Sequence, residues 1–271
     1  MGLWSLTSAE VQGSGHKKSG TPCQDKTCCL ERNKVRVIAL ADGAGSARLS
    51  HLGAEDAVKC AANLLADEFE SLYEESDFKV QQIVASALVR SLGALASKTG
   101  CQTKDLSSTL LAVAVKKNRF VALHIGDGVI GCLLRNKLVT LSEPDNGEFA
   151  HLTWFTTTSN LEEVVRVYRG DASSISGFIL MSDGVEPSLY DGRNSQLADA
   201  VINLFYCNAK YPKGEMADML EQSLQEVIAK RTNDDCSVAL LSRTRYKKYG
   251  EYAKYRKMIA KRNRRAGNTR R

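Results

Sequence analysis

Four acidic motifs in the sequence fall where a β-strand is predicted to end or begin. They are Asp42-Gly43 after residues 35–41, Gly126-Asp127-Gly128 after 120–125, Ser182-Asp183-Gly184 after 177–181, and Asp234-Asp235 before 238–241. In an antiparallel sheet, strand ends of this kind can bring carboxylates to a single rim. The adjacent glycines allow the backbone to turn sharply and its carbonyl to approach a ligand closely.

Such a group of carboxylates predicts a binding site for hard divalent cations. Like charges at one rim repel one another unless protons or cations neutralise them. Mg²⁺ and Mn²⁺ bind all-oxygen sites, whereas zinc favours His or Cys ligands. Two ions about 3.5–4 Å apart can activate a water molecule and stabilise both oxygens of an in-line displacement. The pattern therefore predicts hydrolysis of phosphate esters.

The segments that carry these motifs are short and rich in β-branched residues, which is typical of buried strands. We predict strands at 35–41, 110–115, 120–125, 129–134, 177–181 and 238–241, with weaker candidates at 152–156 and 164–168. The apolar spacing predicts helices at 54–73, 78–97, 195–205 and 214–230, and Gly100 is a stop signal for the second. Strands and helices do not alternate strictly, so we expect mostly antiparallel sheets with helices in outer layers.

The composition is that of a folded protein. The chain has 271 residues, of which 43% are hydrophobic and 25% charged, a length that one large core or two small ones can serve. No segment approaches the roughly 20 uninterrupted apolar residues of a membrane span. Residues 1–10 lack the basic start and apolar stretch of a secretory signal. We therefore expect a cytoplasmic protein with no membrane partner.

The eight cysteines do not form the pattern of a zinc site or a disulfide framework. No pair has CxxC spacing, and the four histidines do not cluster with them, so we expect reduced thiols. No cysteine is followed by Arg six positions later, which excludes the Cys-x₅-Arg mechanism of thiol phosphatases. A complete P-loop, an HExxH motif and the kinase motifs are also absent.

The charge is divided between an acidic body and a basic tail. Residues 242–271 contain thirteen Lys or Arg and one acidic residue, a net charge of +12, and the remainder carries −6. Tyrosines at 246, 249, 252 and 255, followed by Ile259, could form one face of a short helix. Two interpretations stay open: a tail that packs on the domain and is otherwise solvated, or one that docks onto an acidic partner or, with steep salt dependence, onto nucleic acid.

Five segments in this order resemble the metal-dependent type-2C protein serine/threonine phosphatases (the PPM family) in their compact bacterial form. They are GSGHKKSGTPCQD (13–25), IALADGAGSARLSHLGA (38–54), SSTLLAVAVKKNRFVALHIGDG (107–128), FILMSDG (178–184) and NDDCSVAL (233–240). The resemblance implies an α+β fold, a four-layer α-β-β-α sandwich of two mostly antiparallel sheets flanked by helices. The phosphatase-like domain would occupy residues 1–242, and residues 243–271 would form a basic C-terminal extension.

The resemblance also implies the metal ligands. Asp42 would bridge two Mn²⁺ or Mg²⁺ ions, with the Gly43 carbonyl on one ion and Asp183 and Asp234 on the other. Asp127 would hold a third ion. Asp235 stands where many relatives have Asn, which favours Asp234 as the ligand and leaves an exchange of roles open.

Three further positions concern the catalytic step. By resemblance, Asp25 would orient metal-bound water. Many members carry DGHG where this chain has Asp42-Gly43-Ala44-Gly45, so a histidine proposed as the general acid is absent; losing such a group typically costs about 10²–10⁴-fold in rate. The candidates to replace it are Ser46, Arg48, His51 and a metal-bound water. The phosphate-holding arginine of the family also lacks a clean counterpart, and His16 lies nearest to its place in the sequence.

We therefore expect a protein serine/threonine phosphatase that uses a metal-activated bridging water and forms no phosphoenzyme. Its expected partners are phosphorylated protein substrates, including a cognate Ser/Thr kinase or the targets of that kinase. The alternative is a pseudophosphatase or phosphoprotein-binding regulatory module with little turnover, because Ala44 and the missing arginine weaken the catalytic machinery. A nucleic-acid-associated protein that acts through its basic tail is a weaker third possibility.

Overall fold

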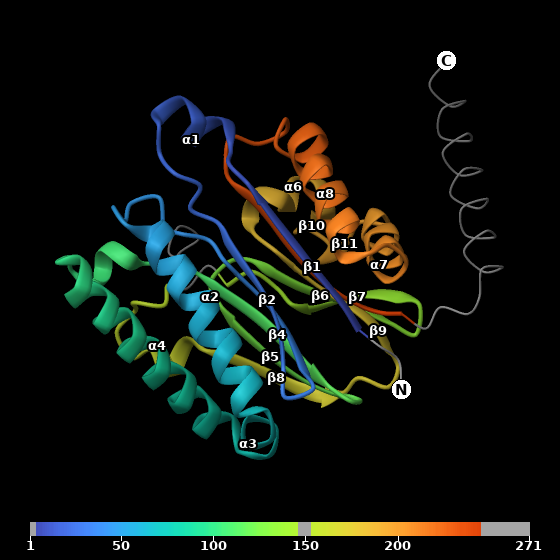
Figure 1. The fold of residues 1–271 in the computed structure, drawn as a ribbon, viewed down its shortest axis with the longest axis horizontal. Helices are drawn as coiled ribbons and strands as arrows, with labels where there is room; N and C mark the ends of the chain where they lie inside the picture. The colour runs from blue at the N-terminus through green and yellow to red at the C-terminus, as the bar shows by residue number, and fades with distance from the viewer. Residues whose placement is uncertain (1–3, 146–152, 245–271) are drawn as a thin grey trace.

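The fold is a sandwich of two five-stranded antiparallel sheets, seen in a computed structural model that describes residues 4–145 and 153–244 (Figure 1). The first sheet has the order β1 (Trp4–Val11), β12 (Cys236–Arg243), β9 (Ile175–Met181), β6 (Val129–Leu134) and β7 (Lys137–Ser142). The second sheet has the order β2 (Lys26–Arg32), β3 (Val35–Ala41), β4 (Leu110–Lys116), β5 (Arg119–Ile125) and β8 (Arg166–Asp171).

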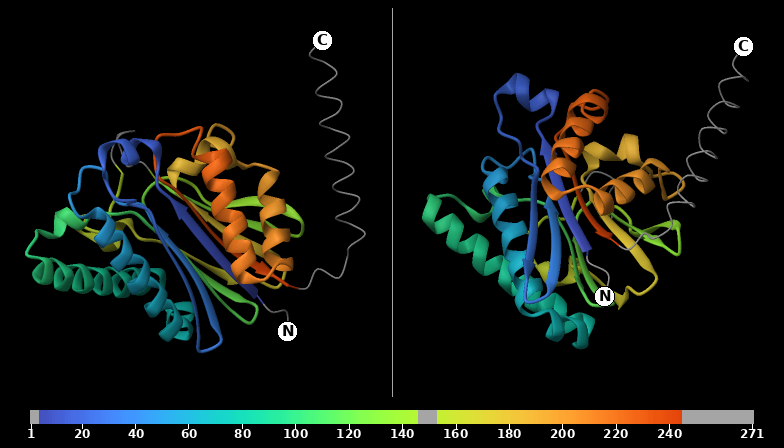
Figure 2. Two further views of the ribbon diagram at one scale, coloured as in Figure 1. Left: turned by 45° about the horizontal axis from the view of Figure 1, so that its top comes forward. Right: turned by 45° about the vertical axis from the view of Figure 1, so that its right-hand side comes forward.

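Helices cover the outer face of each sheet, which gives four layers (Figure 2). The second sheet is covered by α2 (Ser50–Asp67), α3 (Phe69–Glu74) and α4 (Asp77–Thr99), and the first by α7 (Ala200–Lys210) and α8 (Lys213–Ser223). The short elements are α1 (Ser14–Ser19), η1 (Thr103–Leu106), α5 (Leu161–Val164), η2 (Asp183–Val185), α6 (Glu186–Leu189), β10 (Tyr190–Asp191), β11 (Gln196–Leu197) and the π-helical turn η3 (Leu224–Ile228). The predicted α-β-β-α sandwich is confirmed.

The apolar strand segments are continuous because both faces of each sheet are buried. In β3, Val37 and Ala39 face the core under α2 and α4, whereas Ile38 and Leu40 face the core between the two sheets. Phe178 of β9 lies in the same central core and stacks on Trp4. This central core holds the two sheets together face to face. Strand ends from both sheets therefore lie at the same end of the sandwich.

Most predicted elements appear with small shifts, and three predictions are wrong. The helix expected over 54–73 is interrupted at Glu68, where α2 ends and α3 begins. The helix expected over 195–205 begins at Ala200, because Gln196–Leu197 pairs with Tyr190–Asp191 in a two-stranded hairpin. Residues 153–156 of the weaker candidate over 152–156 form no strand, since the Thr156 N–H donates to the Ser108 carbonyl beside the site.

Helix ends follow the local signals in the sequence. Ser76 caps α4 by accepting a hydrogen bond from the Lys79 N–H, and Gly100 ends the helix at φ 64°. Strands β1, β2 and β7 were not predicted, because their polar and apolar residues mix without a long apolar run.

The last strand ends at Arg243, one residue beyond the boundary expected from the sequence. The Arg243 guanidinium lies over the Trp4 ring and donates to the carbonyls of Ile175 and Ala172, so this residue belongs to the sheet. The predicted tyrosine face and the rest of the basic extension lie outside the described residues. Among the helices that the structure describes, none is long and apolar enough to cross a membrane.

Candidate active site

Four strand-end carboxylates line one cavity of about 280 Å³. Asp42 follows β3, Asp127 lies between β5 and β6, Asp183 follows β9, and Asp234 precedes β12. The structure thus brings together residues from both sheets that are up to 192 positions apart in the chain (Asp42 to Asp234). The single rim expected from the sequence exists, and it lies between the two sheets at one end of the sandwich.

Pairing of β3 with β4 positions Asp42. Its N–H donates to the Thr109 hydroxyl at 2.9 Å, and the Thr109 N–H donates back to the Asp42 carbonyl at 2.8 Å. Gly43, which follows, donates its N–H to the Gln24 carbonyl at 3.2 Å. A side chain at position 43 would place its Cβ 2.8 Å from the Cβ of Ser50, so only glycine fits between this loop and α2.

Asp25 is fully buried and is not among the residues that line the cavity, although its charge acts on Asp42. Neither of its carboxylate oxygens has a hydrogen bond of normal geometry, although the hydroxyls of Ser182 and Ser237 lie close enough to offset part of the cost. Burial, reinforced by Asp235 and Asp183, raises the pKa of Asp25 to about 7. A buried carboxylate without partners is costly, which points to a polar or cationic ligand beside it.

Burial, and after it mutual repulsion, raises the pKa values of the carboxylates around the cavity. Burial and then Asp234 raise the pKa of Asp183 to about 6, and burial and then Asp25 raise the pKa of Asp42 well above its ordinary value. The two carboxylates act on each other's pKa, since Asp183 is also among the causes that raise the pKa of Asp42. In the described part of the chain, no three His, Cys, Asp or Glu side chains form a complete metal-binding group as they stand.

Asp127 is fixed by a neighbour that sequence reasoning missed. The Thr153 hydroxyl donates to its Oδ2 at 2.6 Å. Behind this loop, His124 is fully buried, and the Arg166 Nη2 donates both to His124 Nε2 at 2.9 Å and to the Glu143 carbonyl at 2.8 Å. Arg166 therefore links the end of β5, which leads into the loop of Asp127, to the residue that follows β7.

The two adjacent aspartates before β12 face different ways. Asp234 is exposed and lines the cavity, whereas Asp235 is 1% exposed and turns toward the loop over residues 13–24. Asp235 accepts three hydrogen bonds there: from the Gly13 N–H at 2.7 Å, from the Gln24 N–H at 2.6 Å and from His16 Nδ1 at 2.9 Å. The three contacts of the Asp235 carboxylate are all to this loop, whereas the Asp234 carboxylate lines the cavity and accepts from the Asp235 N–H at 2.9 Å.

Only one of the side chains expected to donate a proton or to hold phosphate lines the cavity. His16 lines the cavity, whereas Ser46, Arg48 and His51 are not among the residues that line it. Arg48 is 67% exposed and approaches Asp105 only at 3.9 Å. His51 lies on α2, where burial and then Lys26 lower its pKa. Neither Arg48 nor His51 therefore reaches the cavity, and Ala44 contributes no polar side chain to the cavity that it lines.

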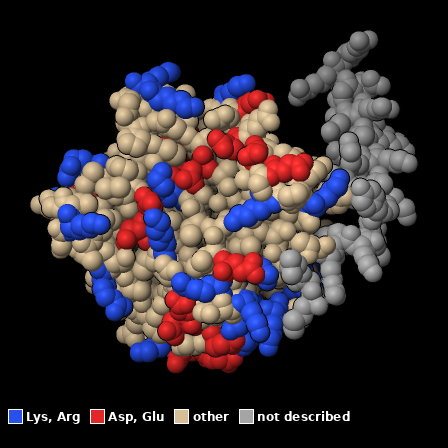
Figure 3. All heavy atoms as spheres, viewed as in Figure 1, with Lys and Arg blue, Asp and Glu red and all other residues tan. Residues whose placement is uncertain are grey.

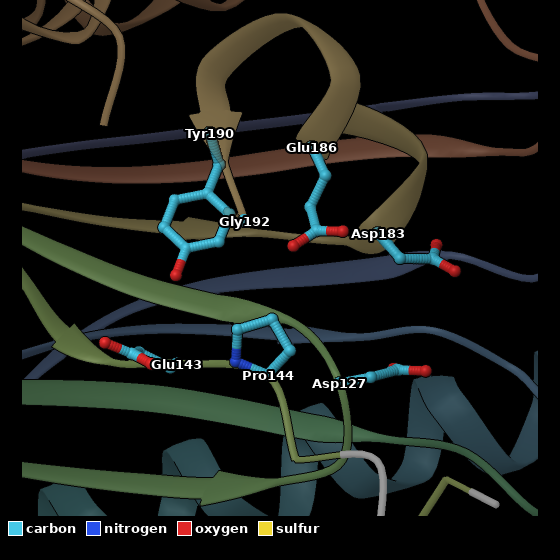
Figure 4. A pocket seen from close by; sticks show the side chains of 7 residues that line it. All are labelled: Asp127, Glu143, Pro144, Asp183, Glu186, Tyr190 and Gly192. Carbon is cyan, nitrogen blue, oxygen red and sulfur yellow. The ribbon is translucent and has the colours of Figure 1, made fainter. Parts of the chain in front are cut away.

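A second pocket of about 400 Å³ adjoins the first and shares Asp127 and Asp183 with it (Figure 4). Glu186 and Tyr190 line one side, and Glu143 lies on the other. Burial, together with Asp183 and Asp127, raises the pKa of Glu186 to about 7. Sequence reasoning missed this residue, although its position three residues after Asp183 was a usable signal.

Comparisons with known proteins agree with this architecture. The family model described as "Protein phosphatase 2C" matches residues 12–227. A bacterial serine phosphatase structure is similar over 89% of this chain and 98% of its own, with 14% identity and a TM-score of 0.60. The Stp1 serine/threonine phosphatase of Staphylococcus aureus (12% identity, 89% and 95% coverage, TM-score 0.58) is also similar. So is the PstP catalytic domain in complex with two manganese ions (18% identity, 89% and 99% coverage, TM-score 0.58). No curated protein sequence matches.

Proposed function

This chain belongs to the protein phosphatase 2C family of metal-dependent protein serine/threonine phosphatases, and from that membership we propose how its own residues carry out the hydrolysis. The enzyme acts on phosphate monoesters of proteins and depends on divalent metal. The observation that carries the assignment of the site is the convergence of Asp42, Asp127, Asp183 and Asp234 on one cavity.

The residues fit a pair of hard cations. The donor set is all oxygen, the carboxylates raise one another's pKa, and the buried oxygens of Asp25 and Asp183 Oδ1 lack partners. We propose that Asp42, the Gly43 carbonyl, Asp183 and Asp234 hold two Mn²⁺ or Mg²⁺ ions. Asp127, held by Thr153, would serve a third. When bound, the cations supply a water of lowered pKa and neutralise charge on the phosphoryl oxygens.

The protein groups around the cavity supply position and proton transfer. Asp25, which is fully buried and acts electrostatically on Asp42, would orient the attacking water by accepting a hydrogen bond from it, which its unpartnered oxygens allow. Thr109 fixes the backbone of Asp42 through two hydrogen bonds. His16 is the residue of the cavity that meets the phosphoryl or leaving group of the substrate.

The pseudophosphatase alternative is not favoured, because the family match covers most of the chain and the carboxylate cavity is intact. Direct binding of nucleic acid by the body of the protein also has little support: on the face shown in Figure 3, basic and acidic residues are interspersed. We also propose a cytoplasmic location, since all eight cysteines are unpaired, and a cognate Ser/Thr kinase or its targets among the substrates.

The test is metal-dependent release of phosphate from a phosphothreonine peptide. The wild-type protein should be active with Mn²⁺ and inactive with EDTA, and Asp183→Asn should lose at least about 100-fold in kcat/KM. Calorimetric Mn²⁺ titration should show weakened binding in the same variant. A wild-type protein that binds Mn²⁺ and releases no phosphate would restore the pseudophosphatase alternative.

A further inference from the structure

A buried carboxylate holds the imidazole of His16 at the edge of the metal cavity. Asp235 is 1% exposed and directly precedes β12, whereas His16 is 23% exposed and belongs to α1. Their contact, His16 Nδ1 to Asp235 Oδ2 at 2.9 Å, joins residues 219 positions apart in the chain. Such a contact requires the loop of α1 to be docked on the start of β12, which the Gly15 N–H to Asn233 carbonyl bond at 2.9 Å also secures.

The contact determines which ring nitrogen faces the cavity. An ionised carboxylate only accepts hydrogen bonds, and Asp235 already accepts from the N–H groups of Gly13 and Gln24. Nδ1 of His16 must therefore carry a proton and donate it to Asp235. The other nitrogen, Nε2, is left for the cavity that His16 lines together with Asp42 and Asp183.

We propose that Asp235 is a positioning residue that holds His16 as the proton donor to the leaving oxygen of phosphoserine or phosphothreonine. This inference rests on the proposed phosphatase function of the same cavity. It gives the acid role, for which Ala44 offers no side chain, to a residue from a different loop. The Asp235 carboxylate accepts from three donors, whereas an Asn there would have to turn its NH₂ toward at least one of them and would carry no negative charge.

The step balances without any further reactant. The oxygen of the attacking water forms a bond to phosphorus as the bond from phosphorus to the serine or threonine oxygen breaks. The proton on His16 Nε2 moves to that leaving oxygen, while the Nδ1 proton stays in its hydrogen bond to Asp235. The proton lost by the attacking water passes to solvent, and Nε2 regains one from solvent before the next turnover.

The experiment compares a poor and a good leaving group. In His16→Ala, kcat for a phosphothreonine peptide should fall at least about 100-fold, because an alkoxide leaves slowly without a proton. For p-nitrophenyl phosphate, whose phenolate leaves readily, kcat should change by less than about threefold. Added imidazole should restore part of the peptide activity of this variant and leave its p-nitrophenyl phosphate activity unchanged.

Asp235→Asn tests the positioning role separately. Its neutral amide has one acceptor oxygen for three donors and no negative charge to stabilise a protonated His16, so peptide activity should fall by about tenfold or more with p-nitrophenyl phosphate activity retained. The double variant should be no slower than His16→Ala alone, because both changes remove one function. Lys18→Ala, an exposed change on the same helix, is the matched control and should act as wild type.

Thermal melting of every variant shows whether it is folded, and Mn²⁺ titration shows whether it still binds metal. Both controls are needed before a loss of activity is assigned to proton transfer. Equal losses on both substrates, or losses that add in the double variant, would overturn the assignment of His16 and Asp235. A His16→Ala protein as active as wild type on the peptide would also overturn the assignment of His16 and Asp235. A wild-type protein with no Mn²⁺-dependent phosphatase activity would instead overturn the proposed function itself.

Discussion

Thr109 and Asp42 are joined by two reciprocal hydrogen bonds across the ends of β4 and β3. The Asp42 N–H donates to the Thr109 hydroxyl at 2.9 Å, and the Thr109 N–H donates to the Asp42 carbonyl at 2.8 Å. Thr109 is 3% exposed at the wall of the cavity, so water has little access to the hydrogen bonds that it makes. The carboxylate at the centre of the site is therefore positioned by the backbone and a neighbouring strand, independently of any ligand.

Replacement of Thr109 by Val should disturb this position. The buried Asp42 N–H would lose its acceptor, at a cost of about 1–3 kcal/mol in the free energy of unfolding, and Mn²⁺ should bind more weakly. Thermal denaturation and calorimetric titration measure the two effects. Thr109→Ser keeps the hydroxyl and should retain most of the affinity; equal affinity in Val and Ser variants would show that the hydroxyl does not position Asp42.

Asp42→Asn should act in opposite directions on activity and on stability. Phosphatase activity should fall at least about 100-fold, because a metal ligand is lost. The metal-free protein should melt at a higher temperature than wild type, since one of several mutually repelling buried carboxylates becomes neutral. Asp218→Asn, an exposed change on α8, is the control and should alter neither property. A variant that keeps more than half of the activity would refute the role of Asp42.

In the metal-free protein, the contribution of the cavity carboxylates to stability should fall as the pH rises from about 4 to about 7, whereas the lowered pKa of buried His124 acts in the opposite direction. Burial raises the folded-state pKa of Asp25 and Glu186 to about 7 and that of Asp183 to about 6, above the ordinary carboxyl values near 4. Groups with raised pKa values stabilise the folded state most when protonated, and this contribution disappears as they ionise.

Melting curves at pH 5 and pH 8 with EDTA measure this effect. Each kcal/mol lost corresponds to about 2–4 °C in Tm for a domain of this size. Saturating Mn²⁺ should narrow the difference between the two pH values, because cations replace protons among the carboxylates. Without Mn²⁺, the same change in Tm between pH 5 and pH 8 in wild type and in Asp183→Asn would contradict the electrostatics described for the cavity.

Gly184→Ala should damage the site through the backbone. A Cβ at this position would lie 1.9 Å from the Asp235 carbonyl oxygen, so the loop after β9 and the start of β12 would have to separate. We expect lower Mn²⁺ affinity and a lower Tm. Gly93→Ala is the matched control: its Cβ would meet no atom within 4 Å in the middle of α4, and it should raise stability by about 0.5–1 kcal/mol.

Asp127→Ala should reduce activity mainly by raising the Mn²⁺ concentration needed for half-maximal rate. The reason is that Asp127, held by Thr153 at 2.6 Å, lines both pockets, whereas Asp42 and Asp234 line only the first. Rates measured over a Mn²⁺ series check this expectation. An unchanged Mn²⁺ dependence would count against a cation at Asp127.

The sequence alone was sufficient to predict the strands that carry the acidic motifs. The segment over 129–134 appears as β6 with the same bounds, and 35–41 as β3, because strands buried on both faces leave uninterrupted apolar runs. Mixed strands such as β1 and β2 leave no comparable signal, and the hairpin of β10 and β11 replaced the first turns of a predicted helix. Local patterns cannot report pairing with distant segments.

The residue types of the site could likewise be predicted from the sequence. Carboxylates beside glycine at strand ends indicate an all-oxygen cation site where those strand ends meet. Which of two adjacent aspartates faces the cavity depended on the tertiary structure. Asp234 and Asp235 have the same chemistry in the sequence, and only the docking of the α1 loop on β12 turns Asp235 toward His16. Hydrogen bonds between residues more than 200 positions apart decide that choice, because the energy of a buried carboxylate depends on the donors that the completed fold places around it.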